Sequence, residues 1–124
     1  MNEVKGALNW VFCDGDLPPK DNSKLDAHEA LMVVNLNDET ANLSIDILFD
    51  NAPPKLGIKV RVEGQRVRSL HLDNPIGDEP GGEFKIPEGQ YALTLHSDIP
   101  VFAVFGRLDV RSSVAYYSVQ GHTY

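Results

Sequence analysis

The sequence predicts an all-β fold, a single-domain antiparallel β-sandwich of about eight short strands over residues 1–124. Glycine and proline recur at short intervals and separate short apolar runs, a pattern that is typical of sandwiches and barrels. Several of these runs alternate apolar and polar side chains with a period of two, as half-buried strands do. Because 42% of the 124 residues are hydrophobic, one domain of this length can bury a sizeable core.

The strands are expected, in chain order, at 7–13, 28–35, 41–49, 57–63, 67–72, 91–95, 101–105 and 115–119. The alternation is clearest in 41–49, where Leu43, Ile45 and Ile47 share one face. Segment 101–105 is more continuously apolar, so we expect it to lie centrally, with both faces covered. A helix starting near Ser23 is the alternative for segment 23–34, but Val33-Val34 favours a strand.

Two connections between these strands are long and polar. Segment 14–27 contains Pro18-Pro19, and segment 73–83 is rich in glycine and acidic residues. Connections of more than about 12 residues in a compact domain are usually functional or mobile. We therefore expect these two connections to be either functional or mobile.

The charge and the cysteine content narrow the class of protein. A net charge of −7 and a pI near 4.9 argue against binding to nucleic acid or to an anionic membrane, because both partners carry negative charge. A single cysteine excludes an internal disulfide. The N-terminal residues lack the pattern of a signal peptide, and no apolar run approaches the length of a membrane span, so we expect a cytoplasmic protein.

The sequence contains no recognisable catalytic or metal-binding motif. Two short pairs, His71 with Asp73 and His96 with Asp98, place two possible ligands on one strand face, which is too few for a metal site. Cys13 lies in an apolar run without a nearby base, so we expect a packed core thiol. We therefore expect neither an enzyme nor a protein that needs a metal or cofactor.

Polar residues at the end of segment 101–111 are the most informative candidates for a site. Arg107, Asp109 and Arg111 alternate with apolar residues, so a continuing strand would place all three on one face. The carboxylate of Asp109 would then hold two guanidinium groups in fixed geometry, ready for carboxylates, phosphates or sugar hydroxyls. The alternative is an ion-pair network at the surface or at a subunit interface.

Other candidates lie on neighbouring strands. His28 and Glu29 are adjacent, so one should face the interior and the other should face solvent. Trp10 alternates with Leu8 and Phe12, which is a core pattern, although an aromatic ring can also stack on a ligand. A further group of basic side chains could line a concave surface or simply cover a solvent-exposed sheet. Its members are Arg61, Arg66, Arg68 and His71, and His71 lies on the opposite face of the strand from Arg66 and Arg68.

Taken in order along the chain, these residues resemble the sensory rhodopsin transducer family. The resemblance runs from about Trp10 to Ser118, and its most specific parts are His28-Glu29 and the Arg107-Leu-Asp-x-Arg111 motif. It implies a small β-sandwich that assembles as a homotetramer. It also implies a cytoplasmic partner of a membrane sensory rhodopsin, within a wider group of domains that bind sugars or related metabolites.

The resemblance maps a ligand site onto this sequence. Its residues would be Trp10, His28, Glu29, Arg107, Asp109 and Arg111. Independently of the resemblance, Arg61, Arg68 and His71 are candidates for additional lining of this site. The leading hypothesis is a non-catalytic domain that senses a small polar ligand, such as a sugar or an organic acid. The alternative is a soluble adaptor that relays the signal of a membrane receptor.

Overall fold

The computed structural model describes residues 5–19, 27–109 and 115–124, and every regular element in these ranges is a strand. The strands are β1 (Ala7–Leu17), β2 (His28–Asn35), β3 (Ala41–Leu48), β4 (Lys55–Val62), β5 (Arg66–His71), β6 (Gly89–Asp109), β7 (Ala115–Val119) and β8 (Gly121–Thr123). The prediction of an all-β antiparallel fold is confirmed. No helix in the described part of the chain is long and apolar enough to cross a membrane.

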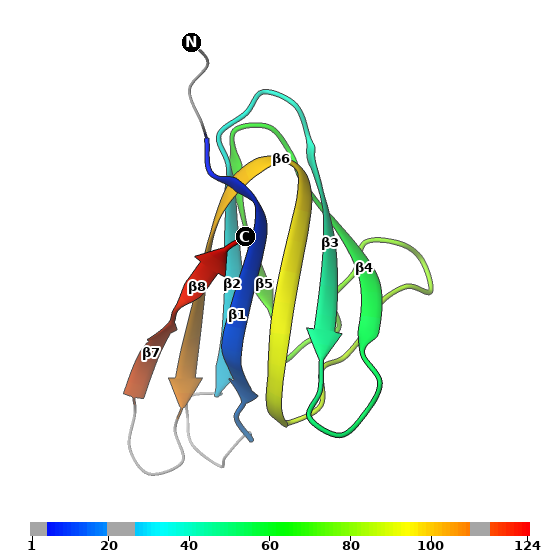
Figure 1. The fold of residues 1–124 in the computed structure, drawn as a ribbon, viewed down its shortest axis with the longest axis vertical. Coiled ribbons are helices and arrows are strands. Elements are labelled where there is room, and N and C mark those ends of the chain that lie inside the picture. Colours follow the sequence, from blue (N-terminus) through cyan, green and yellow to red (C-terminus); the bar gives the residue numbers. More distant parts are fainter. Residues whose placement is uncertain (1–4, 20–26, 110–114) are drawn as a thin grey trace.

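The strands form two layers that share β6 (Figure 1). Sheet A has the order β4-β3-β6-β1-β8, and sheet B has the order β5-β2-β6-β7. All of the pairings are antiparallel. The first half of β6 pairs with β1 and β3, and its second half pairs with β2 and β7, so one strand joins both layers.

The prediction of two separate strands at 91–95 and 101–105 is wrong, because β6 runs through both for 21 residues. It crosses from one layer to the other at residues 97–101, and Figure 1 shows it arching between the layers in the upper part of the molecule. Pro100 needs no ladder partner for its nitrogen. Its carbonyl accepts a hydrogen bond from Asn37 Nδ2 at 2.8 Å, and the next carbonyl, of Val101, accepts one from Trp10 Nε1 at 3.1 Å.

The core lies between the two layers. Its largest fully buried side chains are aromatic or aliphatic and come from both sheets, including Phe12, Leu31, Ile45, Leu93 and Phe105. Burying these groups supplies roughly 25 cal/mol for each Å² removed from water. Because residues of the inner face recur at every second position, the registers of the strands fix which polar groups reach the interior.

The predicted core positions in β1 are partly wrong. A β-bulge between Phe12 and Gly15 interrupts the alternation, and Cys13 is exposed rather than packed in the core. Leu8 is 42% exposed, whereas Trp10 is half-buried against the core with its ring stacked on that of Phe12. Because Cys13 directly follows the buried Phe12, the alternation itself turns the thiol outward, and the bulge then returns Gly15 and Leu17 to the buried face.

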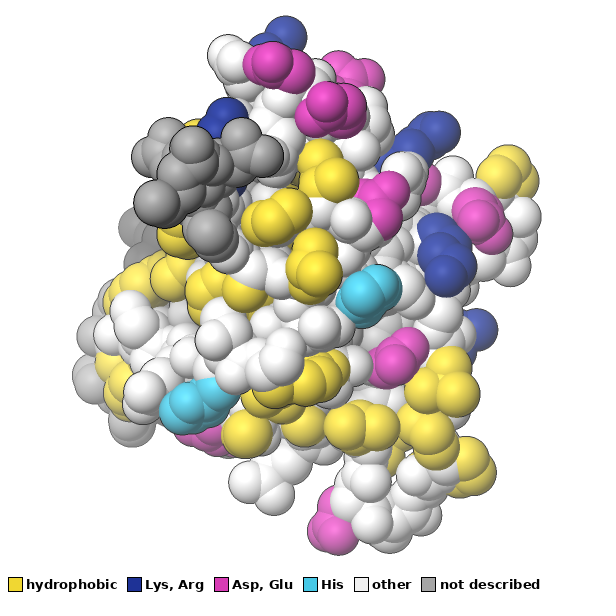
Figure 2. Space-filling model, turned by 45° about the horizontal axis from the view of Figure 1, so that its top comes forward, with side chains coloured by type: hydrophobic (Ala, Val, Ile, Leu, Met, Phe, Trp, Pro, Cys, Tyr) yellow, Lys and Arg dark blue, Asp and Glu magenta, His cyan; other side chains and the backbone are white. Residues whose placement is uncertain are grey.

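The outer face of sheet B is also different from expectation. Segment 101–105 is central in its sheet, but Phe102 and Val104 point outward and are 44% and 49% exposed. Figure 2 shows the molecule tilted so that its top comes forward, and on the visible face acidic, basic and histidine side chains lie among hydrophobic groups. The continuous apolar run in β6 therefore reflects one buried face and one uncovered apolar face.

Candidate functional site

A buried carboxylate lies between the two layers near one end of the sandwich. Glu29 is opposite Arg107 in the β2–β6 register and shares the inner face of β2 with Leu31 and Val33. Its side chain is 0% exposed. A carboxylate removed from water needs compensating charge and hydrogen bonds, so its partners decide whether this position is stable.

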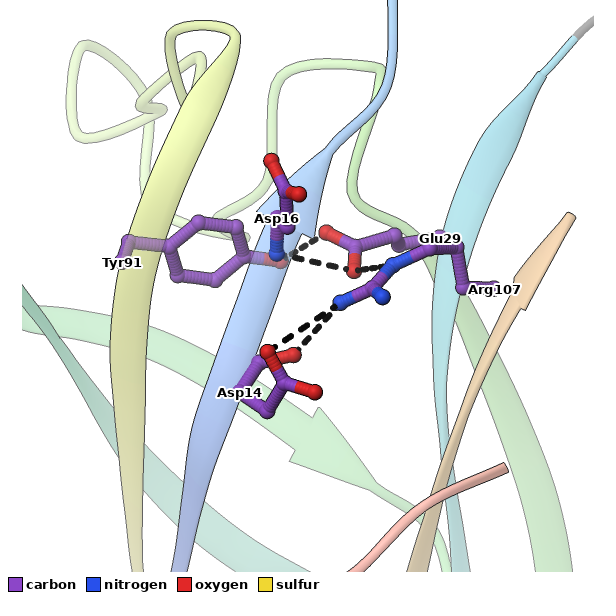
Figure 3. A network of polar contacts seen from close by, with 5 residues as sticks. All are labelled: Asp14, Asp16, Glu29, Tyr91 and Arg107. Atoms are coloured by element: carbon purple, nitrogen blue, oxygen red, sulfur yellow. Dashed lines mark hydrogen bonds and ion pairs between the residues drawn. The ribbon is translucent and has the colours of Figure 1, made fainter. Parts of the chain in front are cut away.

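Three donors, one from β1 and one from each half of β6, supply that compensation (Figure 3). The Tyr91 hydroxyl donates to Glu29 Oε1 at 2.6 Å. Arg107 Nε donates to Oε2 at 2.9 Å, and the backbone N–H of Asp16 donates to the same oxygen at 3.1 Å. The carboxylate thus ties β1 and the first half of β6 in sheet A to β2 and the second half of β6 in sheet B.

Arg107 extends this network to the surface. Its side chain is 11% exposed, and its Nη2 donates to the backbone carbonyl of Asp14 and lies 3.9 Å from Asp14 Oδ1. The Asp14 side chain is 75% exposed. We call Asp14, the Asp16 backbone, Glu29, Tyr91 and Arg107 the Glu29 network. It leads from a fully buried carboxylate to an exposed one through a single guanidinium.

Gly15 makes room for Tyr91 in this arrangement. A Cβ at Gly15 would lie 2.6 Å from a ring carbon of Tyr91, so a larger residue there would displace the phenol. Burial, followed by the nearby charge of Glu29, raises the pKa of Tyr91 far above its usual range. The phenol therefore stays protonated and acts as a hydrogen-bond donor to the carboxylate.

The structure brings two of the six main predicted site residues together, Glu29 and Arg107. The prediction that His28 and Glu29 face opposite sides is confirmed, since His28 lies on the outer face of sheet B with its ring 5.0 Å from that of His71. Trp10 belongs to the wall of the core near Val101. Asp109 ends β6, and Arg111 lies outside the described residues.

The proposed further lining is divided between two places. Arg68 forms a two-bond ion pair with Asp78, with both nitrogen–oxygen distances at 2.7 Å, and also donates to the carbonyl of Arg61 at 2.8 Å. The Arg68 hydrogen bond lowers the pKa of Asp78. Because Asp78 also bonds the β4 backbone, this pair fastens segment 73–83 to the edge of sheet A. His71 points away from it, on the outer face of sheet B.

Asp14, Asp16 and Tyr91 belong to the Glu29 network but were not predicted as site residues. The sequence contains a signal for Tyr91, because it alternates with Leu93 and Leu95 on an inner face and a buried phenol requires a hydrogen-bond partner. It contains no comparable signal for Asp14, which acts through its backbone carbonyl. Arg107 was expected to rest on Asp109, but its described contacts are with Glu29 and Asp14.

Comparisons with known proteins place the chain among transducer-like domains. The family model described as Anabaena sensory rhodopsin transducer matches residues 5–123. The crystal structure of Thermotoga maritima 1070 is similar with a TM-score of 0.83 and 28% identity, covering 98% of this chain and 97% of that one. The Anabaena sensory rhodopsin transducer gives a TM-score of 0.71 and 24% identity, covering 88% and 94%. No curated protein sequence gives a significant match.

Proposed function

Because this chain belongs to the Anabaena sensory rhodopsin transducer family, we propose that it is a signalling domain that senses a small polar ligand, a sugar or an organic acid. We further propose that it acts in the cytoplasm without catalysing a reaction and without binding nucleic acid. The net charge of −7 supports the last point, since nucleic-acid affinity depends on neutralising phosphates.

The Glu29 network is the observation that carries the ligand proposal. Replacing a buried ion pair by apolar side chains is often neutral or stabilising. The buried pair of Glu29 and Arg107 is therefore not needed for a high free energy of unfolding, which favours a role in function. Charged groups of this kind occur frequently at functional sites. Arg107, which is still 11% exposed, connects the buried carboxylate with the surface where a ligand would arrive.

A thermal-shift screen with neutral sugars, sugar acids and small carboxylates tests this proposal on the full chain. A ligand that binds the folded state raises the melting temperature in a saturable manner. The double variant Arg107→Lys, Asp109→Asn keeps the positive charge beside Glu29. If Arg107 and Asp109 hold the ligand, as the sequence predicts, this variant should show a smaller rise in melting temperature than the wild type. Absence of a saturable shift with every compound would contradict the ligand-sensing function.

A second candidate function is an adaptor that relays the signal of a membrane sensory rhodopsin. It is favoured by the family description and by the transducer of Anabaena, whose fold the chain shares. The test is a pulldown from native membranes with the tagged chain. Recovery of a retinal-binding membrane protein is the expected result, and recovery of no integral membrane protein counts against the adaptor.

We also propose that the domain self-associates as a homotetramer through the outer face of sheet B. Among the described residues, the side chains on this face carry no Asp, Glu, Lys or Arg. They are His28, Ala30, Met32, Val34, Val67, Ser69, His71, Phe102, Val104, Gly106, Leu108, Tyr116 and Ser118. Two copies of a chain with net charge −7 can approach there without burying like charges.

A further inference from the structure

A groove lies beside the Glu29 network, where β1 and β3 end and β6 begins. It consists of two adjoining hollows of about 300 and 520 Å³ that share Phe49, Asp50 and Gln90. The first is also lined by residues 13–15, 48, 91 and 92, and the second by residues 51, 52, 84, 87 and 88. We call both hollows together the end groove. Their volumes lie at the scale of small-molecule sites, which is roughly 300–1,000 Å³.

The floor of the second hollow is aromatic. Phe49 and Phe84 are half-buried against the core, with ring centroids 6.5 Å apart and ring planes inclined by 58°. The Lys55 ammonium lies 5.8 Å from the centroid of the Phe84 ring. Rings held in place by the core offer a preformed apolar surface against which the C–H face of a ligand ring can pack.

The rim of the second hollow is polar and acidic. Asp50, Asn51, Glu88 and Gln90 are all exposed and surround the aromatic floor with carboxylate and amide groups. These groups can accept from and donate to hydroxyls on adjacent carbons of one ligand. The rim carries two carboxylates against the Lys55 ammonium beside Phe84, and the chain has a net charge of −7, so the balance of charge opposes the entry of an anion. The combination suits an uncharged ring with several hydroxyls better than an organic acid.

The end groove and the Glu29 network have two residues in common. Asp14 and Tyr91 line the first hollow, and Tyr91 also donates to Glu29 while Asp14 accepts from Arg107. Figure 3 shows Tyr91 reaching from β6 toward β1, where Asp14 and Asp16 lie. A ligand in the first hollow would therefore contact two residues of the Glu29 network.

We propose that the end groove is the ligand site of this domain and that it takes an uncharged saccharide in preference to an organic acid. Phe49 and Phe84 form the apolar floor, and Asp50, Asn51, Glu88 and Gln90 form the hydrogen-bonding rim. This inference rests on the proposed ligand-sensing function. It assigns to that function the groove where β1 and β3 end and β6 begins, in place of the Arg107 to Arg111 strand end.

The first experiment compares neutral disaccharides with sugar acids on the full chain. Maltose and cellobiose are expected to raise the melting temperature saturably, whereas gluconate and glucuronate are not. Asp50→Asn combined with Glu88→Gln keeps the size of both exposed side chains and should raise the Kd for the bound sugar about tenfold, through loss of charge-assisted hydrogen bonds. Phe84→Ala should abolish binding, and circular dichroism verifies that this variant is folded.

Cys13 provides an independent readout of location, because it is exposed, lines the first hollow and is the only cysteine in the chain. A bound disaccharide that extends from the aromatic floor should slow alkylation of Cys13 by iodoacetamide about tenfold, since protection follows the fraction of occupied sites. An unchanged alkylation rate at saturating sugar would overturn the end groove as the site.

The remaining outcomes separate this inference from the proposed function. A sugar whose Kd is unchanged in the Asp50→Asn, Glu88→Gln variant but raised by Arg107→Lys with Asp109→Asn would overturn the groove and leave ligand sensing standing. Tighter binding of a sugar acid than of its neutral parent would overturn the ligand class. If no compound of either kind gives a saturable shift, both proposals fail.

Discussion

At the scale of single residues, the molecule depends most on how Glu29 is compensated. The carboxylate is fully buried and has three hydrogen-bond donors, one of which carries the balancing positive charge. In such a group the cost of desolvation nearly cancels the attraction between the charges. Removal of one partner therefore costs far more than the pair contributes.

Glu29→Gln tests this directly. The amide keeps the shape of the side chain but leaves the guanidinium of Arg107 without its balancing charge, so we expect a loss of about 3 kcal/mol in the free energy of unfolding. Urea denaturation measures the change, and Glu83→Gln at an exposed position serves as the control. The double variant Glu29→Leu, Arg107→Met should be less destabilised than Glu29→Gln. A single variant no worse than the control would contradict the assigned role.

The protonation state of Tyr91 gives a second prediction at this scale. Its pKa is raised in the folded state by burial and by Glu29, so its stabilising effect is complete below the unfolded value of about 10 and is lost as the pH rises above it. In an alkaline absorbance titration, native wild-type protein and Tyr91→Phe should form equal amounts of phenolate up to about pH 11. The wild type should gain one further phenolate on unfolding. If the native wild type forms one more phenolate below this pH than Tyr91→Phe does, Tyr91 ionises in the folded protein and the prediction is contradicted.

At the scale of elements, the attachment of segment 73–83 to β4 depends on one side chain. Asp78 accepts two hydrogen bonds from Arg68 and one from the backbone N–H of Arg61 at 2.8 Å, and its own N–H donates to Lys59 O at 2.8 Å. The pKa of Asp78 is lowered, chiefly by the hydrogen bond from Arg68. Its stabilising effect is therefore present above about pH 4 and is lost as the pH falls through the folded value.

Asp78→Asn should loosen this segment without unfolding the domain. We expect hydrogen exchange at the Arg61 amide to accelerate about tenfold while global stability falls by about 1 kcal/mol, because the ion pair is partly exposed. Asp46→Asn is the matched control, since Asp46 accepts only one backbone hydrogen bond in the described contacts, from Gly57 N at 2.8 Å. Equal exchange at Arg61 in wild type and Asp78→Asn would show that the segment is held by other contacts.

The elements also show what could be predicted from the sequence. Strands β2 and β7 begin and end where alternation and β-branched residues place them. The bulge after Phe12 and the continuation of β6 through Pro100 were missed, because both depend on pairing with distant strands. Only part of the Glu29 network was predicted, because the rest of it also depends on contacts between distant parts of the chain. Glu29 and Arg107 stand out locally, but Tyr91 and Asp14 reach them across 62 and 93 residues of sequence.

At the scale of the whole molecule, the uncovered face of sheet B predicts assembly. Phe102→Glu and Val104→Glu place a charge at the centre of this face and should convert the proposed tetramer to smaller species in light scattering. Leu56→Glu, on β4 and 61% exposed, is the control and should leave the mass unchanged. A tetramer that survives both substitutions in β6 would place the interface elsewhere.

The shared strand β6 has a consequence for how the chain folds during synthesis. In the described structure, β6 pairs with β1, β2, β3 and β7, whereas the pairings that do not involve it are β1 with β8, β2 with β5 and β3 with β4. Two-stranded units are marginally stable in water at best. A nascent chain should therefore remain without a sandwich until residue 109 has left the ribosome, and the many long-range contacts of β6 should make the final collapse slow.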